Sequence, residues 1–97
     1  IVGDGMQRRD YTYVDDVVLA NIQVAFSEKI NGFEILNVGT GINYNMLEIV
    51  RMIGGDYKFI PKRIGEARET LADISKIKKM INWSPKIMIK DWIKNNI

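Results

Sequence analysis

Apolar residues recur at helical spacing in four stretches of the chain, and an Asp or Asn that can cap a helix stands before the first three. A pair of glycines or a Trp-x-Pro segment follows two of these stretches, as expected at helix ends. The helices are predicted from Asp15 or Asp16 to about Glu28, from Asn43 or Asn45 to Gly54, from Asp73 to Trp83, and near Ile89 to Asn96.

The first predicted helix is apolar nearly all round, with Val, Leu, Ile, Ala and Phe on every side. Such a helix needs burial on more than one face, which a chain of 97 residues supplies with difficulty. We therefore expect that this helix packs on a larger sheet in a parent protein.

Short runs of alternating or β-branched residues predict three or four strands between the helices. They are Asp10 to Val14, Phe33 to Val38 and Tyr57 to Ile60. Trp83 and Trp92 are expected as core anchors. The fold class is therefore α/β, a mixed α+β arrangement in one small domain with no repeat and no linker.

Composition excludes several classes of protein. Hydrophobic residues make up 46% and charged residues 27% of the chain, which is ordinary for a globular protein and argues against disorder. The longest uncharged run, residues 35–47, is shorter than the roughly 20 apolar residues that span a bilayer. No signal-peptide pattern opens the sequence. We expect no membrane partner and a cytoplasmic location.

The chain contains no Cys and no His, so disulfides, thiolate chemistry, zinc sites and a Ser-His-Asp triad are excluded. Asp15 and Asp16 could formally bind magnesium, but helix capping explains this pair more simply. The sequence predicts no metal site and no catalytic residue.

Charge is distributed unevenly along the chain. Residues 1–50 hold 3 basic and 7 acidic side chains, whereas residues 51–97 hold 11 and 5. A basic C-terminal half suits an anionic ligand, either a diphosphate or a nucleic acid. The lysines from Lys76 to Lys94 lie on polar helix faces without interleaved aromatic residues, so a small nucleic-acid-binding domain is the weaker alternative.

The segment Arg63-Ile64-Gly65-Glu66-Ala67-Arg68 places a guanidinium, a glycine and a carboxylate in a short loop. The planar fork of Arg63 can bind a phosphate where Gly65 lets the backbone approach closely. Glu66 can accept hydrogen bonds from vicinal hydroxyls such as those of a ribose. The alternative is an exposed ion pair between Arg63 and Glu66, worth roughly 0–1 kcal/mol. Arg68 is interpreted as structural.

Five motifs, in order over nearly the whole chain, resemble the extended short-chain dehydrogenase/reductase family, the NAD-dependent nucleotide-sugar epimerases and dehydratases. UDP-glucose 4-epimerase-like members are most similar. The motifs are Gly3 to Asp16, Asn37 to Gly41, Arg63 to Glu66, Ala72 to Lys76 and Asn82 to Pro85.

This resemblance implies a nucleotide-diphosphate sugar as the ligand. Arg9 and Arg63 match the arginines that hold the diphosphate, Glu66 matches the acid that binds the nucleotide ribose, and Tyr11 matches an aromatic position beside the nucleotide. The expectation is that the two arginines and the acid converge on one ligand.

Two positions depart from the family pattern. Asn82 replaces the usual glycine, and asparagine also tolerates the left-handed conformation of a helix end. Thr70 stands where some epimerases have a nucleotide-contacting tyrosine, which leaves the nucleobase open.

The sequence lacks the family's glycine-rich dinucleotide fingerprint and its Tyr-x-x-x-Lys pair. Residues 1–97 are therefore expected to be a single C-terminal nucleotide-sugar-binding region, with the N-terminal NAD-binding Rossmann part absent. Such a region would hold no cofactor, would be inactive alone, and would self-associate through exposed apolar surface. A stand-alone binding module without catalysis is the alternative. The sugar, and the choice between epimerase, dehydratase and decarboxylase, stay open.

Overall fold

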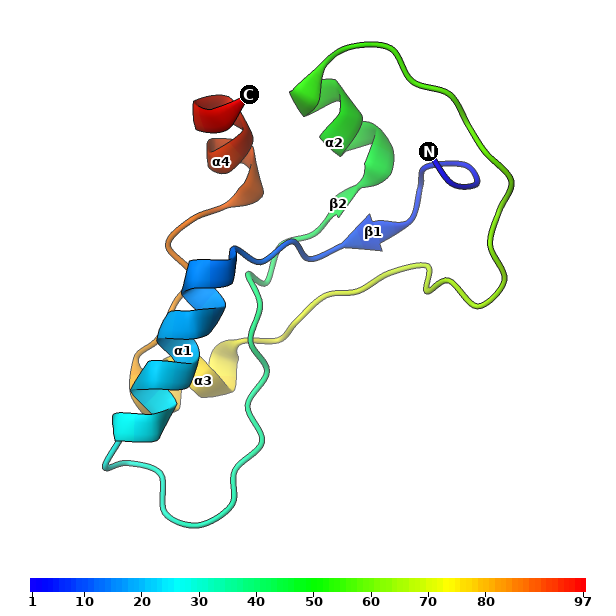
Figure 1. The fold of residues 1–97 in the computed structure, drawn as a ribbon. Coiled ribbons are helices and arrows are strands. Elements are labelled where there is room, and N and C mark those ends of the chain that lie inside the picture. The colour runs from blue at the N-terminus through cyan, green and yellow to red at the C-terminus, as the bar shows by residue number, and fades with distance from the viewer.

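The computed structural model describes residues 1–97 and contains four helices and one two-stranded sheet (Figure 1). In chain order the elements are β1 (Arg8–Arg9), α1 (Val14–Phe26), β2 (Tyr44–Asn45), α2 (Met46–Ile53), α3 (Ser75–Ile81) and α4 (Ile89–Asn96). The predicted α/β class and the four helices are confirmed.

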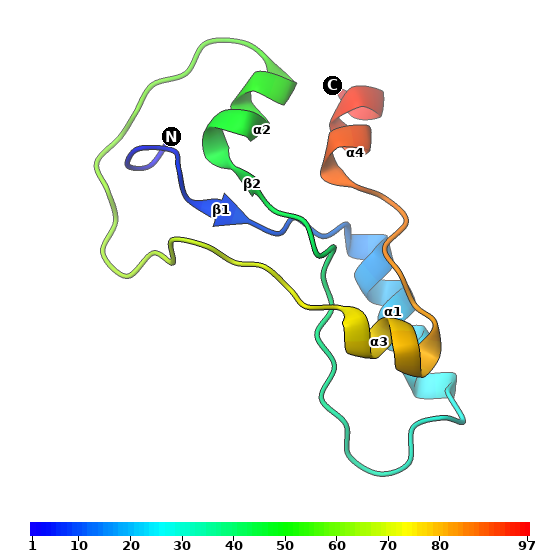
Figure 2. The same cartoon turned by 180° about the vertical axis from the view of Figure 1, so that it is seen from behind.

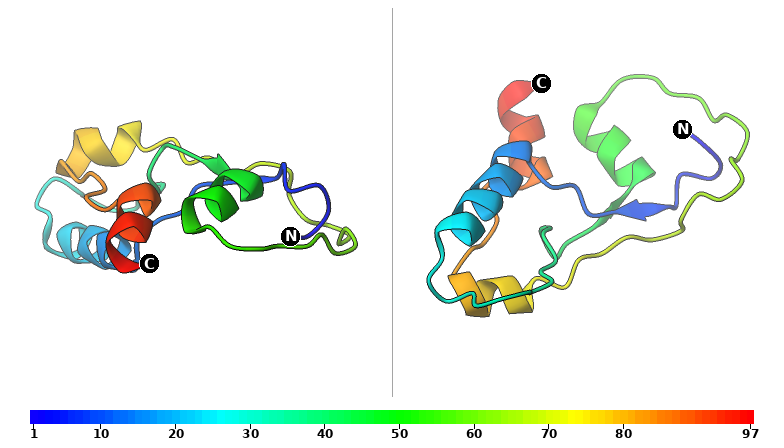
Figure 3. Two further views of the ribbon diagram at one scale, coloured as in Figure 1. Left: turned by 90° about the horizontal axis from the view of Figure 1, so that it is seen from above. Right: turned by 60° about the horizontal axis from the view of Figure 1, so that its bottom comes forward.

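The molecule is a flat slab of 49 × 33 × 16 Å (Figure 3). Its accessible surface is 7068 Å², against about 5,700 Å² expected for a compact chain of this mass. The radius of gyration is 16.1 Å, against about 12.5 Å for a compact domain of this length. The chain therefore buries less surface than an ordinary domain of its size.

The main core lies between α1 and α3, which are side by side in both views (Figures 1 and 2). Ala20 of α1 packs with Ile74 and Ile77 at α3 and with Trp83, which is 1% exposed. Trp83 is thus confirmed as a core anchor. A second, smaller contact joins α2 to α4, and each of these helices has one buried isoleucine, Ile49 and Ile93.

Only one side of α1 is buried. Val14, Val18, Ile22 and Phe26 recur every four residues and are exposed, Phe26 to 84%. This spacing places them along one side of the helix. We call these four residues the α1 stripe. The exposure of the stripe is expected for a helix that is apolar on most of its surface and packs on one side only. Packing of α1 on a larger sheet stays a prediction.

Local capping chemistry sets the ends of α2. The side chain of Asn45 accepts a hydrogen bond from the backbone N–H of Glu48 at 2.8 Å, and Glu48 accepts from the N–H of Asn45 at 2.7 Å. This capping box satisfies two N–H groups that have no partner inside the helix. Gly54, with φ of 82°, ends the helix. Both ends were predicted from the sequence.

The C-terminal end of α3 follows the sequence, whereas the predicted cap, Asp73, lies one residue before the N-cap position. Asp73 Oδ1 accepts hydrogen bonds from the N–H and the hydroxyl of Ser75 at 3.0 and 2.7 Å, so Asp73 organises the start of the helix although Ile74 holds the N-cap position. Asn82 ends α3 in the left-handed conformation with φ of 57°. Asparagine at this position does what a glycine would do.

The predicted cap of α1 is wrong. Tyr13 occupies the N-cap position without a side-chain cap, and Asp15 and Asp16 lie inside the first turn. Asp16 instead accepts hydrogen bonds from the N–H groups of Lys86 and Ile87, both at 3.0 Å, while its carbonyl accepts from the Trp83 indole at 3.0 Å. Asp16 is buried and ties the segment after α3 to α1.

The predicted strand positions are wrong. The only ladder is the antiparallel pair β1–β2, accompanied by isolated bridges from Val2 to Ile60 and from Arg8 to Glu69. Residues 33–38 form no strand, and Phe33 and Ile35 face solvent. A strand needs a neighbouring strand that shares its backbone hydrogen bonds, and no segment of the 97 residues forms a ladder with residues 33–38.

No helix is both long enough and apolar enough to cross a bilayer.

Replacement of Asp16 by alanine should destabilise the fold, because two N–H groups lose a charged acceptor. We expect a loss of about 2 kcal/mol or more in the free energy of unfolding, measured by urea denaturation followed by circular dichroism. The matched control is Asp15→Ala, an exposed neighbour in the same turn, which should change stability by less than about 0.5 kcal/mol. Equal effects of the two variants would contradict a tethering role for Asp16.

Candidate functional site

The site is built around β1, which lies between two segments that are distant in sequence. On one side Arg8 and Arg9 pair with Asn45 and Tyr44 of β2. On the other side the N–H of Arg8 donates to the carbonyl of Arg68 at 2.9 Å, and the N–H of Thr70 donates to the carbonyl of Arg8 at 3.0 Å. The motif that contains Arg9 therefore lies directly beside the loop that contains Glu66.

Arg9 and Glu66, two of the predicted ligand residues, are brought together across 57 residues of sequence. Arg9 Nη2 lies 3.4 Å from Glu66 Oε1, and Arg9 Nη1 donates to the carbonyl of Arg8 at 2.8 Å. The side chains are 24% and 31% exposed. A long, partly solvated ion pair of this kind is weak, worth about 1 kcal/mol or less, so a stronger anionic partner can displace Glu66.

Tyr11 follows Arg9 by two residues, and its hydroxyl donates to the sulfur of Met46 at 3.0 Å. Burial raises the pKa of the Tyr11 phenol, and the nearby charge of Arg9 offsets part of that rise. The phenol is therefore neutral at physiological pH and stands within electrostatic reach of Arg9.

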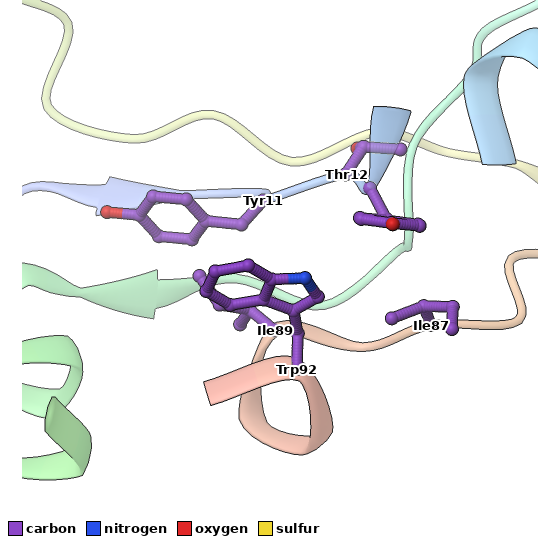
Figure 4. Close-up of a pocket in the computed structure, with 6 residues that line it drawn as sticks. Tyr11, Thr12, Ile87, Ile89 and Trp92 are labelled. Carbon is purple, nitrogen blue, oxygen red and sulfur yellow. The ribbon is translucent and has the colours of Figure 1, made fainter. Parts of the chain in front are cut away.

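The ring of Tyr11 forms one wall of an apolar hollow of about 180 Å³ (Figure 4). In the close-up this ring lies opposite the indole of Trp92, and Ile87 stands at the side. The lining residues are Tyr11, Thr12, Tyr13, Ile87, Ile89 and Trp92. Trp92 is 38% exposed, so the prediction that it is a core anchor is wrong. Trp92 lines a surface hollow because α4 contacts α2 rather than the main core.

Arg63 is exposed and makes no hydrogen bond or ion pair. The alternative interpretation, a surface ion pair between Arg63 and Glu66, is not borne out, since Glu66 pairs with Arg9. Gly65, with φ of 80°, turns the loop between them. The convergence of Arg9 and Arg63 on one ligand stays a prediction.

Arg68 holds the end of this loop. Its guanidinium forms a two-pronged ion pair with Asp4, at 2.9 and 3.0 Å. The hydrogen bond from Arg68 lowers the pKa of Asp4 from 3.8 to about 2. Asp4, Lys62, Glu66 and Arg68 line a hollow of about 230 Å³ whose charges are of both signs. This arrangement agrees with the structural role expected for Arg68.

Sequence reasoning missed Asp10, which stands between Arg9 and Tyr11. One of its carboxylate oxygens accepts from the hydroxyl and the N–H of Thr40 at 2.5 and 3.0 Å. The other accepts from the N–H groups of Gly41 and Ala72 at 3.0 and 3.3 Å. Burial raises the pKa of Asp10, but these hydrogen bonds outweigh burial and hold the pKa below its ordinary 3.8. We call Asp10, Thr40, Gly41 and Ala72 the Asp10 cluster.

Gly39 is required by the Asp10 cluster. A Cβ at this position would collide with the Cβ of Ala72 and would lie 2.9 Å from Asp10 Oδ2. The Gly-Thr-Gly run that follows Val38 was the signal available in the sequence, because glycines and a hydroxyl in a tight loop often surround an anion. Here the anion is a side chain of the protein itself.

A second missed contact supports the same region. The guanidinium of Arg8 donates to the side chain and to the carbonyl of Asn43 at 2.8 and 3.0 Å, and Asn43 donates to Glu69 at 2.9 Å. Arg8 and Asn43 therefore join both neighbours of β1. No feature of the sequence indicated this pairing.

The fold matches solved epimerases: the chain aligns with UDP-glucose 4-epimerase from Thermotoga maritima, crystallised with UDP-glucose, at a TM-score of 0.85 and 32% identity, covering 97% of this chain and 31% of that one. UDP-glucuronic acid 4-epimerase from Bacillus cereus, in complex with UDP-glucuronic acid and NAD, gives a TM-score of 0.85 and 32% identity over 97% and 32% of the two chains.

The chain belongs to the extended short-chain dehydrogenase/reductase family of nucleotide-sugar epimerases and dehydratases, since the model of the GDP-mannose 4,6 dehydratase family matches residues 1–96. It is 39% identical to UDP-glucuronate 4-epimerase from Thermodesulfobacterium geofontis and 30% identical to UDP-glucose 4-epimerase from Mycolicibacterium smegmatis, in each case over 100% of this chain. The chain spans about a third of the length of the curated relatives it matches. The family resemblance inferred from the motifs is confirmed.

Acid should destabilise the fold through Asp10 and Asp4. Both carboxyls have folded pKa values below 3.8, so the native state binds fewer protons than the unfolded state in acid. The free energy of unfolding should be constant above about pH 5 and should fall as the pH drops toward about 2, measured by urea denaturation at each pH. Asp4→Asn should flatten part of this dependence, whereas Asp91→Asn, on an exposed side chain, should leave it unchanged. Stability that rises on acidification would contradict this assignment.

Proposed function

We propose that this chain is the C-terminal substrate-binding part of an NAD-dependent nucleotide-sugar epimerase or dehydratase. The observation that carries this proposal is the pairing of Arg9 with Glu66, since two residues that the motifs assign to the diphosphate and the ribose lie 3.4 Å apart. The family membership and the UDP-sugars named for two similar structures support the same ligand class.

In this proposal, binding of the nucleotide sugar breaks the weak ion pair between Arg9 and Glu66. Each of the two side chains then makes a stronger contact with the ligand. The diphosphate would take the guanidinium of Arg9, and Glu66, released from Arg9, would accept from the ribose hydroxyls. Arg63 would bind the diphosphate from the neighbouring loop, where its guanidinium has no competing partner. Charge-assisted bonds of this kind contribute roughly 1.5–3 kcal/mol each. Tyr11 would flank the nucleotide.

The residues of this chain do not fit NAD. A dinucleotide is held where a glycine-rich turn opens a helix, but the residues before α1, α2 and α4 are Tyr13, Asn45 and Met88. We therefore place NAD on the part of the parent protein outside residues 1–97. What these residues would contribute is the binding and orientation of the substrate.

Nucleotide binding can be tested on the chain itself by titration of UDP, followed by NMR. We expect a dissociation constant in the millimolar range, because only part of the binding crevice belongs to these residues. Arg9→Ala and Arg63→Ala should each weaken binding by about tenfold, as the loss of one charge-assisted bond predicts. Lys90→Ala, which removes a cation from the exposed surface of α4, is the control and should leave the affinity unchanged. Binding that is insensitive to Arg9 and Arg63 would refute the proposed site.

We also propose that the α1 stripe mediates self-association when no other part of the protein covers it. Wild-type protein should show a sedimentation coefficient that rises with concentration, since exposed apolar residues aligned on one helix favour association. Ile22→Lys, in the middle of the stripe, should shift the distribution toward monomer. Asn95→Lys adds the same charge at an exposed position on a different helix, α4, and should not. A strictly monomeric profile of the wild type at all concentrations would contradict this proposal.

A further inference from the structure

The register of β1 is weakly determined by the ladder alone. On one side β1 is held by a two-residue pairing of Arg8 and Arg9 with β2, and on the other by a single bridge from Arg8 to Glu69. Side chains alternate between the two faces of a strand, so a slip of one residue would carry Arg9 to the opposite face from Glu66. A further constraint is needed to keep Arg9 where it is.

Asp10 supplies contacts to both neighbours of β1 from the position next to Arg9. Through Thr40 and Gly41 its carboxylate holds the loop that continues into β2, and through Ala72 it holds the segment that follows the Glu66 loop. Its own N–H donates to the hydroxyl of Thr70 at 3.2 Å. A change of register would break all of these hydrogen bonds together.

The chemistry of the cluster demands a carboxylate. Both oxygens of Asp10 accept from backbone N–H groups, and an amide in either orientation would place an NH₂ donor against one of these N–H donors. Asparagine has the same shape and still cannot satisfy the cluster. The substitution Asp10→Asn therefore removes the hydrogen-bond acceptor while keeping the side-chain volume.

We propose that Asp10 is a positioning residue for the Arg9–Glu66 pair: its carboxylate fixes the register of β1 between the two flanking segments and so aims the Arg9 guanidinium. The effect on nucleotide affinity rests on the function proposed above, whereas the effect on the orientation of Arg9 does not. Asp10 itself touches no ligand in this proposal.

The test uses Asp10→Asn in the 97-residue chain, with Asp91→Asn as a control that removes the same charge from an exposed side chain. Two readouts are taken by NMR: the Nε–Hε resonance of the Arg9 side chain without nucleotide, and the dissociation constant for UDP. Asp10→Asn should move the Arg9 resonance toward that of a free, solvated arginine and should weaken UDP binding about fivefold or more. Asp91→Asn should change neither.

A stability control separates positioning from simple loss of fold. Ile77→Val removes a methyl group from the main core, away from Arg9, and should lower the melting temperature while leaving the Arg9 resonance and the UDP affinity unchanged. If Asp10→Asn does not fold, Thr70→Val, which removes only the hydroxyl that accepts from the Asp10 N–H, should give the same shift of the Arg9 resonance with a smaller amplitude.

An unchanged Arg9 resonance in a folded Asp10→Asn protein, or in Thr70→Val, would overturn the inference. The same shift in Ile77→Val would also overturn it, because the effect would then follow stability. If the wild type binds no UDP, the proposed function fails, and the Arg9 resonance alone decides whether Asp10 positions Arg9.

Discussion

The carboxylate of Asp10 is the interaction on which the arrangement of this chain depends. It joins three motifs that lie far apart in sequence, because Arg9-Asp10 supplies the acceptor while the segments around Thr40 and Ala72 supply donors. Gly39 is needed so that these segments can approach each other. Several motif residues that mark the family therefore serve to assemble the chain, and the residues proposed to bind the ligand stand between them. In a sheet of two short strands, the hydrogen bonds of this partly buried carboxylate take the place of the further ladder hydrogen bonds that longer strands would make.

The candidate site follows from this assembly. Arg9 and Glu66 meet because β1 is pinned beside the loop that ends at the ion pair of Arg68 with Asp4. Both partners are partly solvated, so their attraction is weak. In the proposed function a diphosphate and a ribose compete for them. The relatives are about three times as long as this chain. Under the proposed function, these residues would contribute substrate recognition, and the cofactor would be held elsewhere in the protein.

The four helices, both ends of α2 and the C-terminal end of α3 could be predicted because capping is local: Asn45 and Glu48 stand three residues apart, and Asn82 adopts its left-handed conformation alone. The start of α1 could not, because Asp16 bonds to the distant N–H groups of Lys86 and Ile87 rather than to its own helix. The positions of the strands could not be predicted, because a strand forms only beside another strand, and residues 33–38 have no strand to pair with. Glu66 was assigned to the site by resemblance, but its contact with Arg9 depends on long-range register. Asp10 was missed because a single sequence does not reveal which of its acids is surrounded by backbone N–H donors.

The thickness of the slab, 16 Å, has a consequence for how the molecule unfolds. Almost every side chain lies one layer from water, so denaturation adds little hydrocarbon surface to the solvent. Heat-capacity increments and denaturant m-values both scale with that newly hydrated area. The thermal and urea unfolding transitions of this chain should therefore be broad. A sharper, more cooperative transition would require another layer of polypeptide to cover its surface.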